Sequence, residues 1–132
     1  MKVVHVAVGV IERDRNIFIT RRASHQHQGG KWEFPGGKCE GAETVLQALS
    51  RELHEEIGIE CHSFQPLVVI QHDYGDKQVK LDTHWVRDFA GEPTGLEGQE
   101  GRWVAVEELS SYEFPEANEE ILKRVVSDLS SL

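Results

Sequence analysis

Glutamates are concentrated in one short stretch of the sequence. Glu52, Glu55 and Glu56 have the spacing of neighbouring positions on one helix face, where like charges repel one another unless a cation lies between them. Mg²⁺ and similar hard cations bind oxygen ligands that converge on one point. The alternative is an acidic face exposed to water. A single guanidinium, that of Arg51, cannot neutralise the whole cluster, so the pattern indicates a divalent-cation site.

A helix must position these acids, and local signals mark both of its ends. Thr44 and Gln47 have the spacing of a capping box, which starts the helix near Thr44, and Gly58 fits the left-handed residue that ends a helix. Glu43 precedes the helix, where we expect it to stabilise the positive end of the dipole and pair with Arg51 rather than bind metal. Apolar residues at helical spacing predict one buried stripe: Leu46, Leu49, Leu53 and Ile57.

A glycine-rich segment lies immediately before this helix. Pro35-Gly36-Gly37 is a strong turn signal, and glycine lets the backbone approach a ligand or cation closely. From Gly37 to Ile59 the spacing is glycine, five residues, Glu, seven residues, Arg-Glu-apolar-x-Glu-Glu-x-Gly-apolar. This pattern resembles the Nudix box, the signature of hydrolases that cleave nucleoside diphosphates linked to another group. Every defining position is filled.

The resemblance implies metal ligands and a fold. In that family the box forms a loop, a helix and a loop that bind Mg²⁺ or Mn²⁺ against the diphosphate of the substrate. By this resemblance Glu52, Glu55 and Glu56 are metal ligands, and the carbonyl of Gly36 is a further one.

Other segments resemble one branch of the family, the MutT-type nucleoside triphosphate pyrophosphohydrolases. They span nearly the whole chain: Ala7-Val-Gly, Ile17-Phe-Ile-Thr-Arg-Arg-Ala23, Glu33-Phe-Pro-Gly-Gly-Lys38, Gly91-Glu-Pro, Glu97-Gly-Gln-x-Gly101 and Phe114-Pro-x-Ala-Asn-Glu119. The resemblance implies hydrolysis of 8-oxo-dGTP to 8-oxo-dGMP and pyrophosphate, which removes an oxidised nucleotide before it enters DNA. The alternatives are hydrolysis of CTP or another canonical nucleotide, and a noncatalytic nucleotide-binding module, although such modules typically have degraded boxes.

Asn118 offers a physical basis for selecting the oxidised base. Oxidation at C8 turns guanine N7 into an N–H donor and leaves O6 an acceptor, so one amide can accept from N7–H and donate to O6. Unmodified guanine would leave one side of that amide unpaired, at a cost of about 1 to 3 kcal/mol in a desolvated pocket. The alternative is that Asn118 only caps the final helix.

The branch resemblance places further residues against the substrate. Arg22, at the end of a predicted strand, is expected near the phosphate or sugar. His27 lies in a polar loop, where simple exposure to water is the alternative. The remaining substrate contacts expected by position are those of Glu33, Phe34, Pro35 and Gly36.

The implied reaction is metal-assisted substitution at phosphorus, in which Mg²⁺ polarises the diphosphate oxygens and helps deprotonate the attacking water. In the MutT-type branch water attacks the β-phosphorus. Glu97, in loop 95–101, matches a position that serves there as metal ligand and candidate general base. Other Nudix branches use a glutamate of the box, so Glu52 and Glu55 stay candidates for the base, and Glu97 has the alternative of an exposed loop acid.

Hydrophobic periodicity predicts the elements around this site. Strands are expected over 2–12, 16–20, 65–73, 78–90 and 102–106, and a second helix over 116–132. Its buried face is predicted to consist of Ile121, Leu122, Val125, Val126 and Leu129. Helices on opposite sides of a mixed sheet give an α/β/α sandwich of the α+β class, which the Nudix resemblance also implies. Trp32 and the polar residues Lys80, Asp82 and His84 depart from the branch.

Length and charge narrow the classes of partner. The 132 residues suffice for one core, so we expect a single Nudix domain over residues 1–132. A formal charge of −9 argues against wrapping a polynucleotide and is compatible with a small nucleotide chelated by Mg²⁺. We expect a cytoplasmic location, because the sequence has neither a membrane-spanning stretch nor a secretory signal, and we also expect a monomer. Cys39 and Cys61 are expected to be free thiols.

Overall fold

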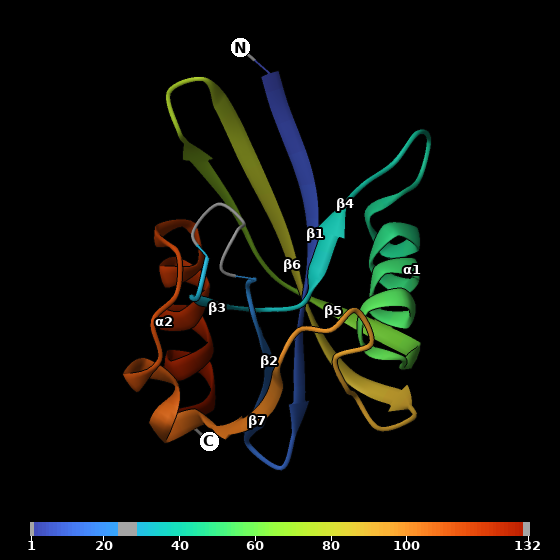
Figure 1. The fold of residues 1–132 in the computed structure, drawn as a ribbon, viewed down its shortest axis with the longest axis vertical. Helices are drawn as coiled ribbons and strands as arrows, with labels where there is room; N and C mark the ends of the chain where they lie inside the picture. Colours follow the sequence, from blue (N-terminus) through green and yellow to red (C-terminus); the bar gives the residue numbers. More distant parts are fainter. Residues whose placement is uncertain (1, 24–28, 131–132) are drawn as a thin grey trace.

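The computed structural model describes residues 2–23 and 29–130, and its described strands form one mixed sheet (Figure 1). The strands are β1 (Lys2–Arg13), β2 (Asn16–Arg21), β3 (Trp32–Glu33), β4 (Gly36–Lys38), β5 (Glu60–Asp73), β6 (Lys77–Ala90) and β7 (Gly101–Ala105). The helices are α1 (Val45–Ile57), the 3₁₀ helix η1 (Val106–Ser111) and α2 (Glu116–Ser130).

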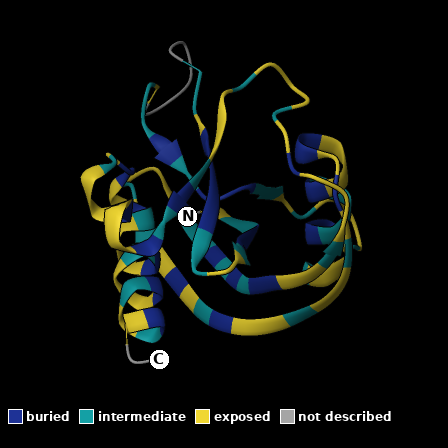
Figure 2. Ribbon diagram, turned by 90° about the horizontal axis from the view of Figure 1, so that it is seen from below, coloured by how far each residue is buried: buried dark blue, intermediate teal, exposed yellow. Residues whose placement is uncertain are grey.

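The two α-helices lie on opposite sides of the sheet, as predicted for an α/β/α sandwich (Figure 1). Side chains alternate between the faces of β1, so Val8 and Val10 join the core beneath α2, whereas Ala7 and Ile11 join the core beneath α1. Figure 2 shows the buried residues as stripes along both helices. The buried face of α2 contains Ala117, Ile121, Val125 and Leu129, while Leu122 and Val126 are only partly buried.

Strand β1 organises the sheet because three other strands pair with it. One edge pairs in parallel with β6 over ten residues, from Lys2 opposite Lys77 to Ile11 opposite Val86. The other edge is shared between two antiparallel partners, β4 near its middle and β2 near its end. Between these two partners the N–H of Gly9 donates to the carbonyl of Pro35 at 2.8 Å. The segment that precedes α1 is thereby fixed to the centre of the sheet.

Both ends of α1 are as the sequence predicts. The Thr44 hydroxyl accepts from the Gln47 N–H at 3.2 Å, and the Gln47 side chain accepts from the Thr44 N–H at 2.9 Å. Gly58 ends the helix at a φ of 74°, and its N–H donates to the carbonyl of His54.

Three local predictions are wrong. Leu46 is 43% exposed, because the buried face of α1 is centred nearer Leu49 and Glu56. Gly36 and Gly37 form strand β4 with β1 rather than a turn. Strand β5 begins at Glu60 instead of residue 65; three register irregularities against β6 interrupt the alternation that marks a strand.

Two other features bear on the predictions. Cys39 and Cys61 are free thiols, as expected. Within the ranges 2–23 and 29–130, no helix combines the length and apolar character needed to cross a bilayer.

Candidate active site

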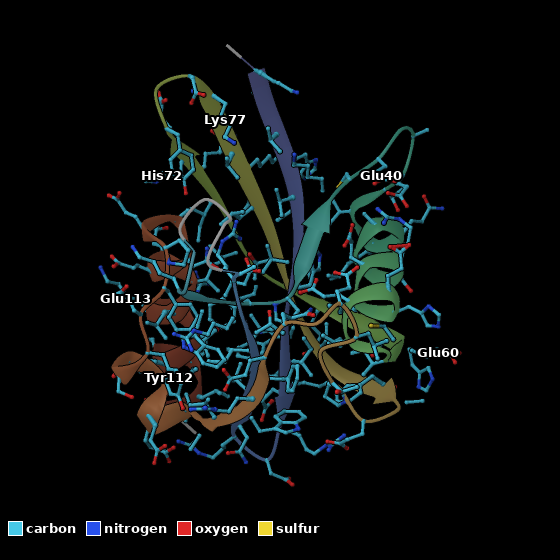
Figure 3. All side chains as sticks on the ribbon, viewed as in Figure 1. Glu40, Glu60, His72, Lys77, Tyr112 and Glu113 are labelled. Carbon is cyan, nitrogen blue, oxygen red and sulfur yellow. The ribbon has the colours of Figure 1, made fainter. Side chains whose placement is uncertain are left out.

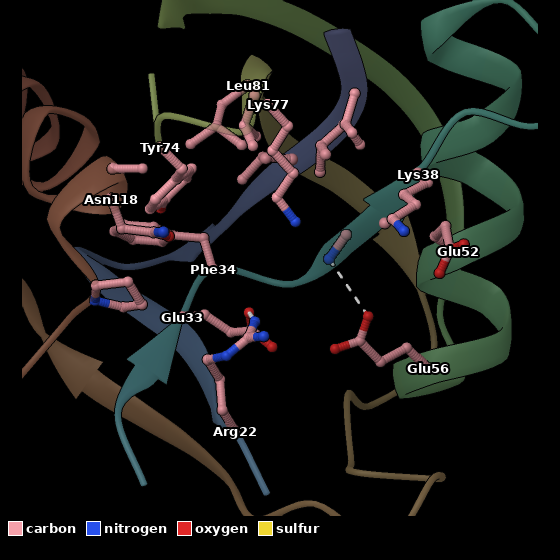
Figure 4. A pocket seen from close by; sticks show the side chains of 18 of the residues that line it. Arg22, Glu33, Phe34, Lys38, Glu52, Glu56, Tyr74, Lys77, Leu81 and Asn118 are labelled. Atoms are coloured by element: carbon pink, nitrogen blue, oxygen red, sulfur yellow. Dashed lines mark hydrogen bonds and ion pairs between the residues drawn. The ribbon is translucent and has the colours of Figure 1, made fainter. Parts of the chain in front are cut away.

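A cavity of about 440 Å³ extends between α1 and α2 (Figure 4). Asn118, Phe34 and Tyr74 lie at one end, and the carboxylates of Glu52 and Glu56 lie at the other. Apolar side chains of β1 and β6 also line the cavity: Val4, Val6, Val8, Val79 and Leu81. One continuous space therefore connects a neutral amide with a cluster of carboxylates.

The cavity brings together most of the residues that the sequence predicted for the site. Those that line it are Arg22, Glu33, Phe34, Gly36, Glu52, Glu56, Glu97 and Asn118. Pro35 is not among them, and its carbonyl accepts from Gly9. Glu55 does not line it either, because its side chain is half-exposed and pairs with Arg51 at 3.4 Å. His27 lies outside the described residues.

Glu56 is a buried carboxylate without a cationic partner among the described residues. Glu56 is 7% exposed, and its carboxylate oxygens accept from the Gly36 N–H at 3.3 Å and the Thr20 hydroxyl at 3.5 Å. Burial first, and then the nearby carboxylates of Glu33, Glu97 and Glu52, together raise the pKa of Glu56 to about 8, against the lowering effect of the Gly36 hydrogen bond. This environment disfavours a lone negative charge and suits a bound cation.

Glu52 lies directly against the backbone of Gly37. A Cβ atom placed on Gly37 would be 2.2 Å from Cδ of Glu52, so only glycine leaves room for this carboxylate. Burial raises the pKa of Glu52, while Arg51, at 3.0 Å, lowers it. The sequence predicted that a ligand or cation would approach this glycine closely; in the structure the group that does so is the Glu52 side chain of α1.

Arg51 holds the outer part of the acidic cluster. Its guanidinium donates to both oxygens of Glu43, at 2.7 and 2.9 Å, which confirms the predicted pair. Hydrogen bonds from Arg51, followed by that from the Glu40 backbone, lower the pKa of Glu43 to about 2. The charge of Glu43 is thereby neutralised outside the cavity, as expected for a residue that does not bind metal.

The donor set fits a hard divalent cation. Carboxylates of Glu52, Glu56 and Glu97 border the same space as the backbone of Gly36, and Mg²⁺ and Mn²⁺ prefer oxygen ligands. In the described part of the chain, no three His, Cys, Asp or Glu side chains already form a metal-binding group. Ion binding would therefore draw the side chains at this end of the cavity closer together.

Arg22 and Glu33 form an ion pair between the two ends of the cavity. The Arg22 guanidinium donates to Glu33 at 2.5 Å, and both side chains are about three-quarters buried. Burial raises the pKa of Glu33 in spite of the lowering effect of Arg22. The pair keeps a guanidinium at the wall of the cavity, where it can meet an anionic group.

Asn118 lies within the first turn of α2, and its side chain lines the cavity. Helix α2 begins at Glu116, and the Asn118 N–H donates to the carbonyl of Pro115 at 2.9 Å. The residue is therefore inside the helix rather than at its cap. Beside it, the rings of Phe34 and Phe114 stack with their centroids 5.1 Å apart. The amide is thus held at an aromatic end of the cavity.

Sequence reasoning missed two residues of this end, Tyr74 and Lys77. Both belong to the β5–β6 hairpin, and Figure 3 shows Lys77 near the tip of that hairpin. Their only sequence signal was an aromatic and a basic residue beside a turn glycine. Reaching the cavity depends on the long strands that carry the hairpin back toward α2.

The polar residues of β6 that depart from the branch face away from the cavity. Lys77, Val79 and Leu81 line it, whereas the residues at the alternate positions, Lys80, Asp82 and His84, do not. Asp82 instead lies 3.5 Å from His5 and 3.7 Å from His84. Trp32 is buried, and its ring meets that of Tyr112 edge to face. Of the polar side chains in this segment, only that of Lys77 reaches the cavity.

The raised pKa of Glu56 predicts that the metal-free protein loses stability as pH rises from about 5 to 8. Unfolding restores the ordinary pKa near 4.5, so the unfolded chain is ionised in this range while the folded protein retains a proton. The free energy of unfolding should fall by at most about 1.4 kcal/mol per pH unit. Thermal unfolding in EDTA measures this slope, and Glu56→Gln should flatten it.

The control is Glu120→Gln, an exposed substitution on α2, which should leave the slope unchanged. A slope in Glu56→Gln equal to that of the wild type would contradict the assignment to Glu56.

Comparison with known proteins shows which proteins this chain is similar to. A family model described as "NUDIX domain" matches residues 6–124. An 8-oxo-dGTP diphosphatase from Escherichia coli K12 is 42% identical over 126 residues, which cover 95% of this chain and 98% of that protein. A CTP pyrophosphohydrolase from the same organism is 36% identical, covering 93% and 91%. A solved structure from a study of MutT from Aliivibrio salmonicida and Vibrio cholerae has a TM-score of 0.84 at 41% identity, covering 96% and 99%.

Proposed function

Because this chain belongs to the Nudix hydrolase family, we propose that its cavity is the active site of a nucleoside triphosphate pyrophosphohydrolase that acts on 8-oxo-dGTP. Members of the family generally need a divalent metal, and we propose Mg²⁺ here. The observation that carries this proposal is the single cavity with Asn118 at one end and the carboxylates of Glu52, Glu56 and Glu97 at the other. In this arrangement the base of a nucleotide would lie at the Asn118 end and its phosphates at the carboxylate end.

At the metal end, Glu52, Glu56, Glu97 and the carbonyl of Gly36 would hold the ion. Bound there, Mg²⁺ would supply positive charge next to the phosphate oxygens and would make the attacking water more acidic. Glu55 is half-exposed and paired with Arg51, so a ligand role would require its side chain to turn inward. Arg22 can donate to a phosphate oxygen from the wall of the cavity, since its guanidinium already donates to Glu33 there.

The general base must accept a proton from water near the β-phosphorus. We propose Glu97, because it borders the cavity from a loop and Glu56 is buried. Glu52 also borders the cavity, but Arg51 donates to its carboxylate at 3.0 Å and stabilises its charged form. Glu55, the other candidate from the sequence, does not line the cavity, which supports Glu97 as the base.

At the base end, Asn118 would accept from N7–H of the oxidised guanine and donate to O6. Its side chain lies beside Phe34 and Tyr74, which provide an apolar surface around the purine (Figure 4). Water is displaced from such a surface, so an unpaired side of the amide is costly. This supports 8-oxo-dGTP over dGTP.

A CTP pyrophosphohydrolase is the second candidate function, because one such relative is 36% identical. Steady-state assays of 8-oxo-dGTP, dGTP and CTP with Mg²⁺ separate the two. We expect the highest kcat/KM with 8-oxo-dGTP. A strong preference for CTP would refute this substrate assignment, and turnover of none of them would favour a nucleotide-binding module.

Asn118→Ala should reduce the preference for 8-oxo-dGTP over dGTP by about 10- to 100-fold, since the amide contributes about 1 to 3 kcal/mol to the difference. The loss should fall mainly on the kcat/KM of the oxidised nucleotide. Asn118→Asp keeps the size but cannot donate to O6, so it should also lose the preference. Asn16→Ala, outside the cavity, should keep it. An unchanged ratio in Asn118→Ala would assign discrimination to other residues.

A further inference from the structure

The loop that carries Glu97 is attached to the C-terminal end of α1. The last carbonyls of a helix lack partners within the helix. Here the carbonyl of Ile57 accepts from the Thr94 N–H at 3.0 Å, and that of Glu56 accepts from the Leu96 N–H at 2.9 Å. The residue that supplies the buried carboxylate thus also anchors the loop through its backbone.

The side chain of Gln99 strengthens this attachment. Its Oε1 accepts from the N–H of Glu97 at 3.0 Å, and its Nε2 donates to the carbonyl of Glu56 at 3.4 Å. A backbone N–H only donates and a carbonyl only accepts, so the chemistry of both partners requires this orientation of the amide. One side chain therefore bridges Glu97 and Glu56.

The far end of the loop is fixed as well. The Arg21 N–H donates to the carbonyl of Glu100 at 2.9 Å, and Arg102 pairs with the Glu100 carboxylate at 2.8 Å. Between the two anchored ends, the hydrogen bond that the Glu97 N–H donates to the Gln99 side chain holds the backbone of Glu97 itself. Glu97 is exposed, so packing does little to hold its backbone in place.

We propose that Gln99 is a positioning residue that sets the Glu97 backbone relative to α1, so that the Glu97 and Glu56 carboxylates reach one divalent ion. Gln99 acts through its two hydrogen bonds and contacts neither nucleotide nor metal. This role deepens the proposed function, since it depends on Glu97 serving the metal site. Residues that orient metal ligands typically contribute about 10- to 100-fold to metal affinity.

Mn²⁺ titration followed by electron paramagnetic resonance tests this role without turnover. Gln99→Ala removes both bonds and should raise the Kd for Mn²⁺ by about tenfold. Gln99→Glu can still accept from Glu97 but cannot donate to Glu56, so it should also weaken binding, even though its negative charge would by itself attract the cation. Gln71→Ala alters an exposed glutamine on β5 away from the cavity and should bind Mn²⁺ like the wild type.

Two further readouts separate positioning from a general loss of structure. Amide hydrogen exchange at Glu97 should accelerate in Gln99→Ala while the melting temperature stays near that of the wild type. In a Glu97→Ala background, Gln99→Ala should weaken Mn²⁺ binding no further, because its effect passes through Glu97. An additive loss would overturn the inference.

Activity distinguishes failure of this inference from failure of the proposed function. Unchanged Mn²⁺ affinity and unchanged Glu97 exchange in Gln99→Ala would overturn the role of Gln99, whatever the substrate. Wild-type protein that binds Mn²⁺ but does not hydrolyse 8-oxo-dGTP would refute the substrate instead. In the active enzyme, Gln99→Ala should raise the Mg²⁺ concentration for half-maximal rate by the same factor as the Kd, with a smaller change in the nucleotide KM.

Discussion

Glu56→Gln should lower kcat/KM for 8-oxo-dGTP by about 10²- to 10⁴-fold, because a metal ion contributes several kcal/mol to such a reaction and each 1.4 kcal/mol is a factor of ten. The amide has the shape of the carboxylate and can still accept from the Gly36 N–H, but it carries no charge to hold the ion. The substituted protein should stay folded. Steady-state kinetics across a Mg²⁺ series measures the loss.

Measuring the stability of Glu56→Gln shows whether its loss of activity comes from a lost metal ligand rather than from unfolding. Without metal at pH 8, Glu56→Gln should unfold at a higher temperature than the wild type, because it removes a buried carboxylate that neighbouring acids disfavour. Glu120→Gln should match the wild type in both rate and stability. Turnover that survived in a folded Glu56→Gln protein would place the metal centre elsewhere.

Gly37→Ala should lower kcat/KM by about 10- to 100-fold, a loss comparable to removing a residue that orients a metal ligand. The new Cβ would stand 2.2 Å from Cδ of Glu52, and the flexible carboxylate, rather than the sheet, would move away. Stability should therefore change little while Mn²⁺ affinity falls. Calorimetric titration and thermal unfolding of the same sample separate the two effects.

Gly41→Ala is the matched control for this substitution. Its φ of 54° makes alanine mildly strained, but the added Cβ would meet nothing within 4 Å. It should lose some stability and keep its Mn²⁺ affinity, the reverse of Gly37→Ala. Equal metal affinity in both variants would show that Glu52 has room to rearrange and still bind.

The carboxylate end of the cavity could be predicted from the sequence because its pattern is local. Thr44, Gln47 and Gly58 define a helix by short-range hydrogen bonds, and the spacing of Glu52 and Glu56 follows from that helix. The α/β/α sandwich was also predictable, since long strands and two amphipathic helices leave few arrangements.

Other parts depended on contacts between distant segments. The short strand β4 exists because β1 offers it an edge, and Gly36 and Gly37 alone read as a turn. Tyr74 and Lys77 reach the cavity only because the hairpin extends toward α2, and Gln99 gains its role from a carbonyl 43 residues away. Such partners are set by topology, which no local pattern encodes.

The two ends of the cavity are supplied by largely separate parts of the fold. Helix α2, the β5–β6 hairpin and Phe34 provide the residues around Asn118, whereas α1 and the loop after β6 provide the carboxylates and β4 provides the backbone of Gly36. Substitutions that alter which nucleobase is preferred can therefore accumulate without disturbing the machinery at the phosphates. We therefore expect substrate preference to change in evolution mainly through substitutions at the Asn118 end.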